Sequence, residues 1–219
     1  MIEFRDYQKD IIARGIGILK PHRFLYLAME VRTGKTLTSL GICDKLQVKK
    51  VLFITKKKAI SSIEKDYELL IPDFELVVIN YESLHKIKQT GWDVIICDEA
   101  HGMGAFPKPS GRSKKVKNIV FRCNPYVILL SGTPTPESYS QMYHQVNFIP
   151  NNPFDEFKNF YQFSSRYVGV VKKKIGGMYI NDYSKGSKEI LVKMKPYTIR
   201  FSQKQAGFVV ETTEKILEV

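Results

Sequence analysis

Five short apolar runs place the strongest constraint on how this chain can fold. They are Phe24–Met29, Val51–Thr55, Leu76–Ile79, Val94–Cys97 and Tyr126–Leu130. Each is rich in Val, Ile, Leu or aromatic residues, and polar residues do not alternate with apolar ones along any of them. Runs of this kind predict strands that are buried on both faces, as in a parallel sheet.

Amphipathic stretches lie around and between these runs. Helices are predicted over Tyr7–Leu19, Thr36–Leu46, Ala59–Leu70 and Ser113–Phe121, and helix is expected to dominate from Glu137 to Phe160. Alternating strands and helices predict right-handed crossovers and an α/β fold, with a parallel sheet covered by helices on both faces.

The character of the sequence changes after about residue 162. Gly176-Gly177 stands between Lys172–Ile175 and Met178–Ile180, which predicts a short hairpin or a loop. The last stretch, Phe208–Val219, has an extended pattern without the features of a natural domain end. We therefore expect a main domain over residues 1–160 and a basic appendage over residues 161–219.

The net charge of +12 is concentrated in two strips. Residues 103–125 carry six basic and no acidic residues, and residues 164–204 carry ten basic and two acidic ones. Seven aromatic residues interleave with the second strip and can stack on bases. This distribution slightly favours a nucleic-acid partner over the alternative, which is solvated loops that are rich in lysine.

Several other classes of protein are disfavoured. No apolar run reaches the ~18 residues of a membrane span, and the first ten residues lack the apolar region of a secretory signal. The three cysteines form no CxxC pair. We expect an intracellular protein in a reducing compartment, the cytoplasm or nucleoid, or the host cytoplasm if the source is viral.

A candidate phosphate-binding loop follows the first run. Residues 29–36 read Met-Glu-Val-Arg-Thr-Gly-Lys-Thr, and a helix is predicted to begin there. Gly34, Lys35 and Thr36 supply the end of the pattern GxxxxGK[ST], in which the lysine neutralises phosphates and the hydroxyl binds Mg²⁺. Met29 replaces the first glycine of that pattern. An ordinary helix start capped by Thr33 is the structural alternative.

Two further candidates follow later strands. Asp98-Glu99-Ala100-His101 comes directly after Val94–Cys97, where open α/β sheets bind ligands. Asp98 is a candidate Mg²⁺ ligand and Glu99 a candidate base for the attacking water. Ser131-Gly132-Thr133-Pro134-Thr135 follows the fifth run and can sense a phosphate, although a simple turn has the same composition. Chance rarely places all three after buried strands in this order.

Together these segments resemble the first RecA-like lobe of superfamily 2 helicases, specifically the SWI/SNF-type DNA translocases. Residues 27–36 resemble motif I, Asp98–His101 a DEAH form of motif II, and Ser131–Thr135 motif III. Asn80-Tyr81-Glu82 and residues 195–200 also resemble segments of that family. The resemblance covers nearly the whole chain and implies a P-loop NTPase fold with ATP and Mg²⁺ as cofactors.

The resemblance also assigns roles to residues. It implies catalysis by Lys35, Asp98 and Glu99, and metal binding by Thr36 and Asp98. Nucleotide binding is implied for Arg5, Gln8, Arg32, Thr33, Gly34, Lys35 and Thr36, with Gln8 on the base. Coupling of the nucleotide to movement is implied for His101, Ser131 and Thr133. Contacts to DNA, with duplex favoured over single strands or RNA, are implied for Lys56, Lys57, Ser113 and Lys114.

The sequence departs from the family in two ways. Arg32 stands where the family usually has glycine. The later motifs and their arginine finger are absent, so we expect a lobe whose second helicase lobe is missing, and an isolated chain with negligible ATP hydrolysis. An RNA helicase, a restriction-type motor and a nucleic-acid-binding module with a decayed nucleotide site are the alternatives.

Overall fold

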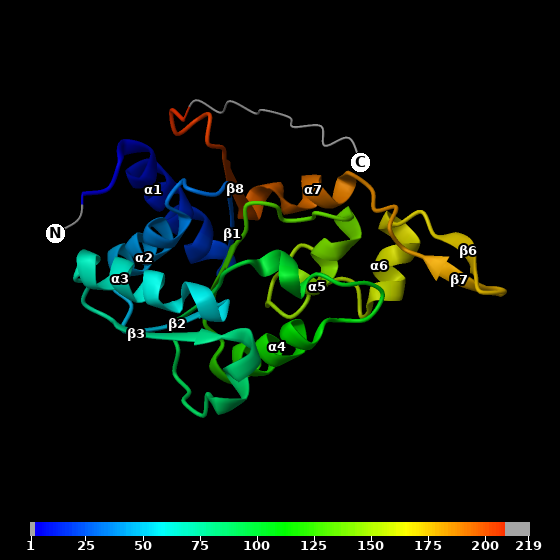
Figure 1. Cartoon of the computed structure of the whole chain (residues 1–219), viewed down its shortest axis with the longest axis horizontal. Helices are drawn as coiled ribbons and strands as arrows, with labels where there is room; N and C mark the ends of the chain where they lie inside the picture. The colour runs from blue at the N-terminus through cyan, green and yellow to red at the C-terminus, as the bar shows by residue number, and fades with distance from the viewer. Residues whose placement is uncertain (1–2, 209–219) are drawn as a thin grey trace, which may run out of the picture.

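The computed structural model describes residues 3–208 and is centred on one six-stranded parallel sheet (Figure 1). The strands are β1 Phe24–Met29, β2 Lys50–Thr55, β3 Glu75–Asn80, β4 Val94–Cys97, β5 Tyr126–Leu130 and β8 Thr198–Phe201. Their order across the sheet is β3-β2-β4-β5-β1-β8. The predicted fold class is confirmed, and the five predicted strands lie within one residue of their observed ends.

Helices cover both faces of the sheet. They are α1 Asp6–His22, α2 Lys35–Lys45, α3 Ile60–Leu70, α4 Gly111–Cys123, α5 Met142–Val146, α6 Phe160–Tyr167 and α7 Glu189–Met194. Short 3₁₀ helices are η1 Lys57–Ala59, η2 Tyr81–Lys86, η3 Ala100–Met103, η4 Tyr139–Gln141 and η5 Lys195–Tyr197. The helices α1, α2 and α3 pack on one face, and α4, α5 and α6 pack on the other.

Alternate residues of each central strand enter opposite cores. In β1, Leu25 and Leu27 contribute to the core under α1 to α3, whereas Phe24 and Tyr26 contribute to the core under α4 to α6. All four side chains are fully buried. This two-sided burial explains why the strand lacks polar alternation, because neither of its faces meets water.

Two expectations about secondary structure are wrong, and one strand was not predicted. β3 lies at the edge of the sheet and is half-buried, because only β2 pairs with it. The stretch from Glu137 to Phe160 holds only η4 and α5, followed by turns. β8 was not predicted as a strand, yet it pairs in parallel with β1.

The stretch predicted to be an appendage, residues 161–219, contributes partly to the main core and partly to a separate hairpin. Phe163, Tyr167 and Ile190 are buried in the same core as the central strands, so residue 160 is not a boundary in the packing. The predicted hairpin is present as β6 Val171–Ile175 and β7 Met178–Asp182, which form a separate antiparallel pair. Its turn needs two positive φ angles, and Gly176-Gly177 provides them at 55° and 85°. Most of Phe208–Val219 lies outside the described residues.

Candidate nucleotide site

The three candidate segments meet at one edge of the sheet. The phosphate loop follows β1, the acidic pair follows β4, and the Ser131 turn follows β5, which lies between those two strands. Because all the strands are parallel, their carboxyl ends share one edge. Two strand spacings separate β1 from β4 by about 10 Å. This arrangement is the crevice in which open α/β sheets bind ligands.

The loop after β1 presents an open helix start. Gly34 is the N-cap of α2, with a left-handed φ of 74° and no side-chain cap on the first turn. This φ favours glycine, and a Cβ on Gly34 would lie 2.6 Å from Nε2 of Gln8 and would displace that amide. The uncapped N–H groups of the first turn can therefore donate to an anion, and Lys35 and Thr36 stand beside them half-exposed.

The buried side chain of Gln8 supports this loop through polar contacts. Its side-chain oxygen accepts from the N–H of Arg5 at 3.0 Å, and its Nε2 lies 3.4 Å from Oγ1 of Thr38 and 3.5 Å from the carbonyl oxygen of Gly34. Gln8 is 4% exposed. In this conformation its amide is occupied within the protein, whereas the sequence predicted that it reads the base.

Thr33 and Arg32 differ in what they offer a nucleotide. Thr33 is buried, its hydroxyl donates to the carbonyl oxygen of Glu30 at 2.7 Å, and its own carbonyl oxygen accepts from the Tyr7 hydroxyl at 3.2 Å. Arg32 is exposed and has a left-handed φ of 63°. The family's usual glycine would adopt this φ without strain, so arginine carries a cost of about 1–2 kcal/mol here.

The segment after β8 holds the phosphate loop through contacts that no sequence pattern predicted. The backbone N–H of Gln203 donates to Oε2 of Glu30 at 2.8 Å, and Nε2 of Gln203 donates to the carbonyl oxygen of Val31 at 2.9 Å. The N–H of Glu30 also donates to the carbonyl oxygen of Phe201 at 3.0 Å. Only the pairing of β8 with β1 brings these segments together, and no local sequence pattern announces that pairing.

Asp98 has the free oxygen that a metal ligand needs. Its Oδ2 accepts from the Thr55 hydroxyl at 2.9 Å, while its Oδ1 is buried without a hydrogen-bond partner in the described part of the chain. Burial raises the pKa of the Asp98 carboxyl, and the Thr55 hydrogen bond and the charge of Lys35 oppose that rise. Lys35 therefore acts electrostatically on Asp98, as expected of two groups that share one cleft. An orphaned buried carboxylate oxygen fits a hard cation such as Mg²⁺.

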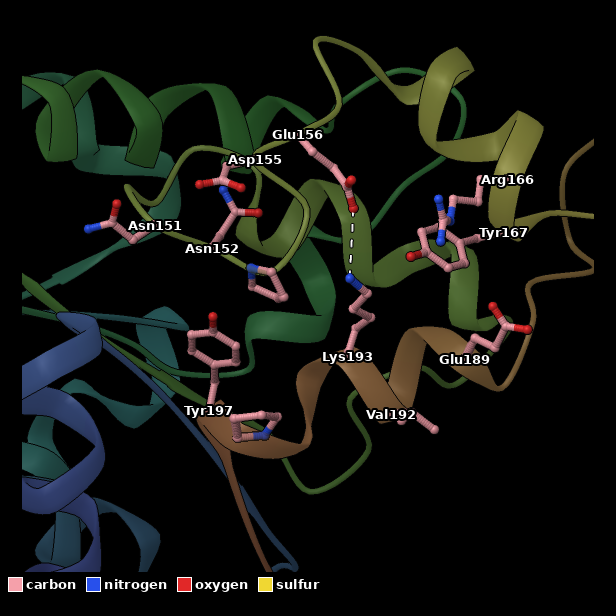
Figure 2. A pocket seen from close by; sticks show the side chains of 12 residues that line it. Asn151, Asn152, Asp155, Glu156, Arg166, Tyr167, Glu189, Val192, Lys193 and Tyr197 are labelled. Carbon is pink, nitrogen blue, oxygen red and sulfur yellow. Dashed lines mark ion pairs between the residues drawn. The ribbon is translucent and has the colours of Figure 1, made fainter.

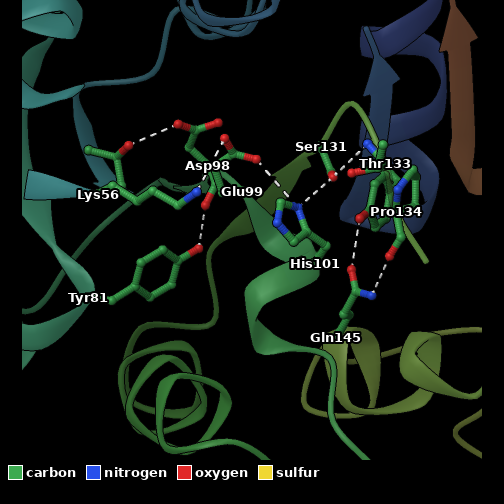
Figure 3. A network of polar contacts seen from close by, with 11 residues as sticks. Lys56, Tyr81, Asp98, Glu99, His101, Ser131, Thr133, Pro134 and Gln145 are labelled. Carbon is green, nitrogen blue, oxygen red and sulfur yellow. Dashed lines mark hydrogen bonds and ion pairs between the residues drawn. The ribbon is translucent and has the colours of Figure 1, made fainter. Parts of the chain in front are cut away.

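The Glu99 carboxylate lies between the side chains of Lys56 and His101 (Figure 3). Its Oε1 is 3.6 Å from Nζ of Lys56, and its Oε2 is 3.4 Å from Nδ1 of His101. The same His101 nitrogen lies 3.0 Å from Oγ of Ser131, which also accepts the N–H of Thr133 at 3.1 Å. Burial lowers the pKa of His101, Glu99 opposes this effect, and Lys56 and Lys35 add to it. The acidic turn is thus joined to the turn after β5.

The candidate DNA contacts separate into accessible and inaccessible side chains. Lys57 and Lys114 are exposed, and Lys56 is half-exposed at the end of β2. Ser113 is 2% exposed, and its hydroxyl donates to the carbonyl oxygen of His144 at 2.8 Å. Ser113 therefore anchors α4 to α5 through its buried hydroxyl in this structure, and the DNA contact predicted for it stays a prediction.

Two supporting residues come from positions to which sequence reasoning gave no role here. The Tyr81 hydroxyl donates to the backbone carbonyl oxygen of Asp98 at 2.6 Å. Gln145 accepts from the Tyr26 hydroxyl at 2.8 Å and donates to the carbonyl oxygen of Pro134 at 2.8 Å. These buried bonds fix the backbones of the acidic turn and of the turn after β5.

A groove of about 730 Å³ lies elsewhere, between α6, α7 and the loop after α5 (Figure 2). An ion pair of 3.8 Å between Glu156 and Lys193 crosses it. Tyr197 lines it and immediately precedes β8, so the groove adjoins the amino end of that strand. It therefore lies toward the amino ends of the parallel strands, whereas the phosphate loop lies at their carboxyl ends. A smaller cavity of about 210 Å³ adjoins the loop itself, beside Glu30 and Gly132.

Comparison with known protein families decides the classification. The family model of the SNF2-related domain matches residues 34–219. The chain belongs to this family. The matched region begins at Gly34, the first residue of the glycine-lysine-threonine segment that starts α2.

Curated relatives and solved structures agree with this assignment. The chromatin-remodeling ATPase INO80 of Aspergillus terreus is 27% identical over 117 residues, which is 53% of this chain and 6% of that protein. INO80 of Candida glabrata is 29% identical over the same length, 53% of this chain and 7% of that protein. The chain thus matches less than a tenth of the length of these relatives.

Among solved structures, the SWI2/SNF2 ATPase core of Sulfolobus solfataricus in complex with dsDNA has a TM-score of 0.70 at 16% identity. The match covers 94% of this chain and 46% of that one. The Hef helicase domain of Pyrococcus furiosus has a TM-score of 0.53 at 17% identity, covering 67% and 36%. These likenesses establish the shared fold. Within residues 3–208, no helix is long and apolar enough to cross a membrane.

Proposed function

We propose that this chain is the first, ATP-binding lobe of an ATP-dependent DNA translocase. The observation that carries the proposal is the convergence of Lys35, Asp98 and Ser131 at one sheet edge in a member of the SNF2-related family. The two basic strips and the dsDNA bound to the Sulfolobus ATPase core support DNA as the partner. Such a partner would place the protein inside a cell, in the nucleoid, nucleus or host cytoplasm.

The roles proposed for the site follow from its chemistry. Lys35 and the N–H groups at the start of α2 bind and neutralise the phosphates. Thr36 and Asp98 would hold Mg²⁺, which supplies charge neutralisation between the phosphates when it is bound. Glu99 orients the attacking water and takes its proton. His101 and Ser131 transmit the state of this site to the turn after β5.

Binding measurements test the proposal. We expect calorimetry to detect MgATP binding by the chain, and Lys35→Ala to weaken it by at least about tenfold, because a phosphate-binding lysine contributes a charge-assisted contact. Arg14→Ala provides a control, since Arg14 is exposed on α1 and pairs with Asp10. If millimolar MgATP gives no heat of binding, the decayed-site alternative replaces this proposal.

The nucleic-acid partner is tested separately. Duplex DNA, single-stranded DNA and duplex RNA of equal length are compared by fluorescence anisotropy at one salt concentration, because affinities depend strongly on salt. We expect duplex DNA to bind most tightly. Tighter binding of RNA would instead identify an RNA helicase lobe.

A further inference from the structure

The ion pair between Lys56 and Glu99 joins two residues that the proposed function uses for different ligands. Lys56 is a candidate contact to the DNA backbone, and Glu99 is the candidate base at the nucleotide. Their charged atoms lie 3.6 Å apart, with side chains 39% and 29% exposed (Figure 3). The pair is therefore partly shielded from solvent, while Lys56 remains within reach of an external anion.

The register of the sheet builds this pair. Strands β2 and β4 are neighbours, and Ile54 pairs with Cys97. Lys56 and Glu99 each stand two residues beyond that pair of residues, so both leave the sheet at the same level. Glu99 has a left-handed φ of 50°, which is rare for glutamate. Such a backbone conformation is retained only where the surrounding structure fixes it. Here it accompanies a Glu99 side chain that lies beside Lys56 and His101.

Each carboxylate oxygen of Glu99 has a side chain beside it, of which only Lys56 carries a charge while His101 is neutral. Oε1 faces Lys56 and Oε2 faces His101 at 3.4 Å. A carboxylate beside an ammonium group is attracted to it and held against it. The same contact fixes the direction in which the carboxylate points. Release of Lys56 would leave Glu99 free to turn toward a water molecule.

The surface around Lys56 attracts phosphates. Lys57 and Lys58 follow it and are exposed, and no acidic residue lies between Asp44 and Glu64 in the sequence. A nucleic-acid backbone carries closely spaced negative charges and gains affinity from each lysine that neutralises one of them. A phosphate seated on this lysine run would therefore compete with Glu99 for Lys56.

We propose that a DNA phosphate and Glu99 compete for Lys56, so that DNA binding frees the catalytic carboxylate. This inference rests on the proposed function and adds to it a physical route by which DNA would stimulate hydrolysis. Lys56 acts in it as a positioning residue, because it reaches the reaction only through Glu99.

A double-mutant cycle on DNA affinity tests the competition without any nucleotide. Duplex DNA binding is measured for the wild-type chain, Glu99→Gln, Lys56→Ala and the double variant. We expect Glu99→Gln to tighten binding about two- to fivefold, which is the contribution of one partly exposed ion pair. We expect the same substitution to have no effect when Lys56 is already alanine. Circular dichroism checks that each variant is folded.

A neighbouring lysine supplies the matched control. In a Lys57→Ala background, Glu99→Gln should still tighten DNA binding, because Lys57 does not pair with Glu99 in the described structure. If the gain persists in the Lys56→Ala background, the effect is a general loss of negative charge and the inference is overturned. If Glu99→Gln leaves the affinity of the wild-type chain unchanged, the inference is overturned as well.

The rate of ATP hydrolysis gives a second measurement, and a lysine with a purely structural role would not change it in the way described next. Under single-turnover conditions in a full-length version that carries the second lobe, Lys56→Ala should raise the DNA-free rate relative to wild type and reduce the stimulation by DNA, and Lys56→Arg should restore both. A lower DNA-free rate in Lys56→Ala would overturn the inference. A wild-type chain that binds no DNA would overturn the proposed function, whereas binding with additive substitutions would overturn only this inference.

Discussion

The ring of His101 faces the hydroxyl of Ser131, with 3.0 Å between Nδ1 and Oγ, and thereby links the turn after β4 to the turn after β5. Ser131 also accepts the N–H of Thr133, which leaves its own proton free to point at His101. Because burial lowers the pKa of His101, the ring is neutral at pH 7 and can accept that proton. Nucleotide-dependent shifts of one turn can therefore reach the other.

The first prediction concerns this link. In a full-length version that carries the second lobe, we expect His101→Ala and Ser131→Ala each to reduce DNA-stimulated ATP hydrolysis about five- to tenfold, with MgATP affinity unchanged within about twofold. The double variant should lose no more than either single variant, because both remove the same contact. Steady-state hydrolysis with and without duplex DNA measures the effect. Additive losses would mean that the two residues act separately.

The second prediction is that Asp98, the carboxylate proposed to bind the metal, lowers the stability of the nucleotide-free protein. Asp98 is buried, its Oδ1 has no partner in the described structure, and burial raises its pKa. Asp98→Asn removes a buried charge, so we expect it to raise the free energy of unfolding by about 0.5–2 kcal/mol.

Urea unfolding without nucleotide measures this change. Asp93→Asn is the matched control, because both backbone N–H groups of Lys49 and Lys50 donate to its carboxylate, so that substitution should destabilise the protein. A less stable Asp98→Asn variant would contradict the prediction.

The third prediction is a loss of stability on mild acidification. Burial lowers the pKa values of both His101 and His144, and Nδ1 of His144 is buried without a partner in the described part of the chain. Below the ordinary histidine pKa of about 6.5, the unfolded chain takes up protons more readily than the folded one. The stability that neutral histidines contribute is thus complete above about pH 6.5 and is lost as the pH falls through their lowered pKa values.

Urea unfolding at pH 7.5 and pH 5.5 checks this behaviour. His144→Gln should show a smaller difference between the two pH values than wild type. His85→Gln, at an exposed position, controls for the loss of a histidine. A pH difference that does not shrink in His144→Gln would assign the acid sensitivity to other groups.

The sequence was sufficient to predict the strands that are buried on both faces. β1, β4 and β5 lack polar alternation because both of their faces are covered, and the phosphate loop and acidic pair were recognised by residues that directly follow them. β8 escaped prediction because it includes the exposed Arg200 and only one of its four residues is fully buried, so it lacks the unbroken apolar pattern of the other strands. Its strand character arises from pairing with β1, which is a tertiary effect.

Side-chain roles were less predictable than positions. Gln8 and Ser113 match family segments, yet each is buried and bonded to its own protein in this structure. A pattern in one dimension does not tell which way a side chain turns. The contact of Lys56 with Glu99 was likewise out of reach, because it depends on the order of β2 and β4 in the sheet.

The fourth prediction concerns the clamp on the phosphate loop. Gln203 donates from its side chain to the carbonyl oxygen of Val31, and its backbone N–H donates to Glu30. Gln203→Ala removes the first bond and should loosen a loop that already contains a strained Arg32. We expect MgATP affinity to fall about two- to tenfold, the effect of one hydrogen bond and some lost preorganisation.

Calorimetry of Gln203→Ala tests this expectation, with Gln205→Ala as the control. Gln205 belongs to the same turn but bonds only to Ser202 among the described contacts. Equal losses in the two variants would show that the turn as a whole matters and that the Val31 contact does not.

The last prediction separates a structural residue from a DNA contact on the same helix. Ser113 and Lys114 are adjacent in α4, but Ser113 is buried against His144 and Lys114 is exposed. Ser113→Ala leaves the carbonyl oxygen of His144 without its donor, so we expect a loss of about 1–2 kcal/mol of stability and unchanged DNA affinity. Lys114→Ala should leave stability within about 0.5 kcal/mol, weaken DNA binding and reduce its salt dependence by about one counterion. Thermal unfolding and DNA titrations at several salt concentrations measure both quantities. If Ser113→Ala folds normally and weakens DNA binding as much as Lys114→Ala does, then α4 must turn when DNA binds, and the buried position of Ser113 would describe only the DNA-free protein.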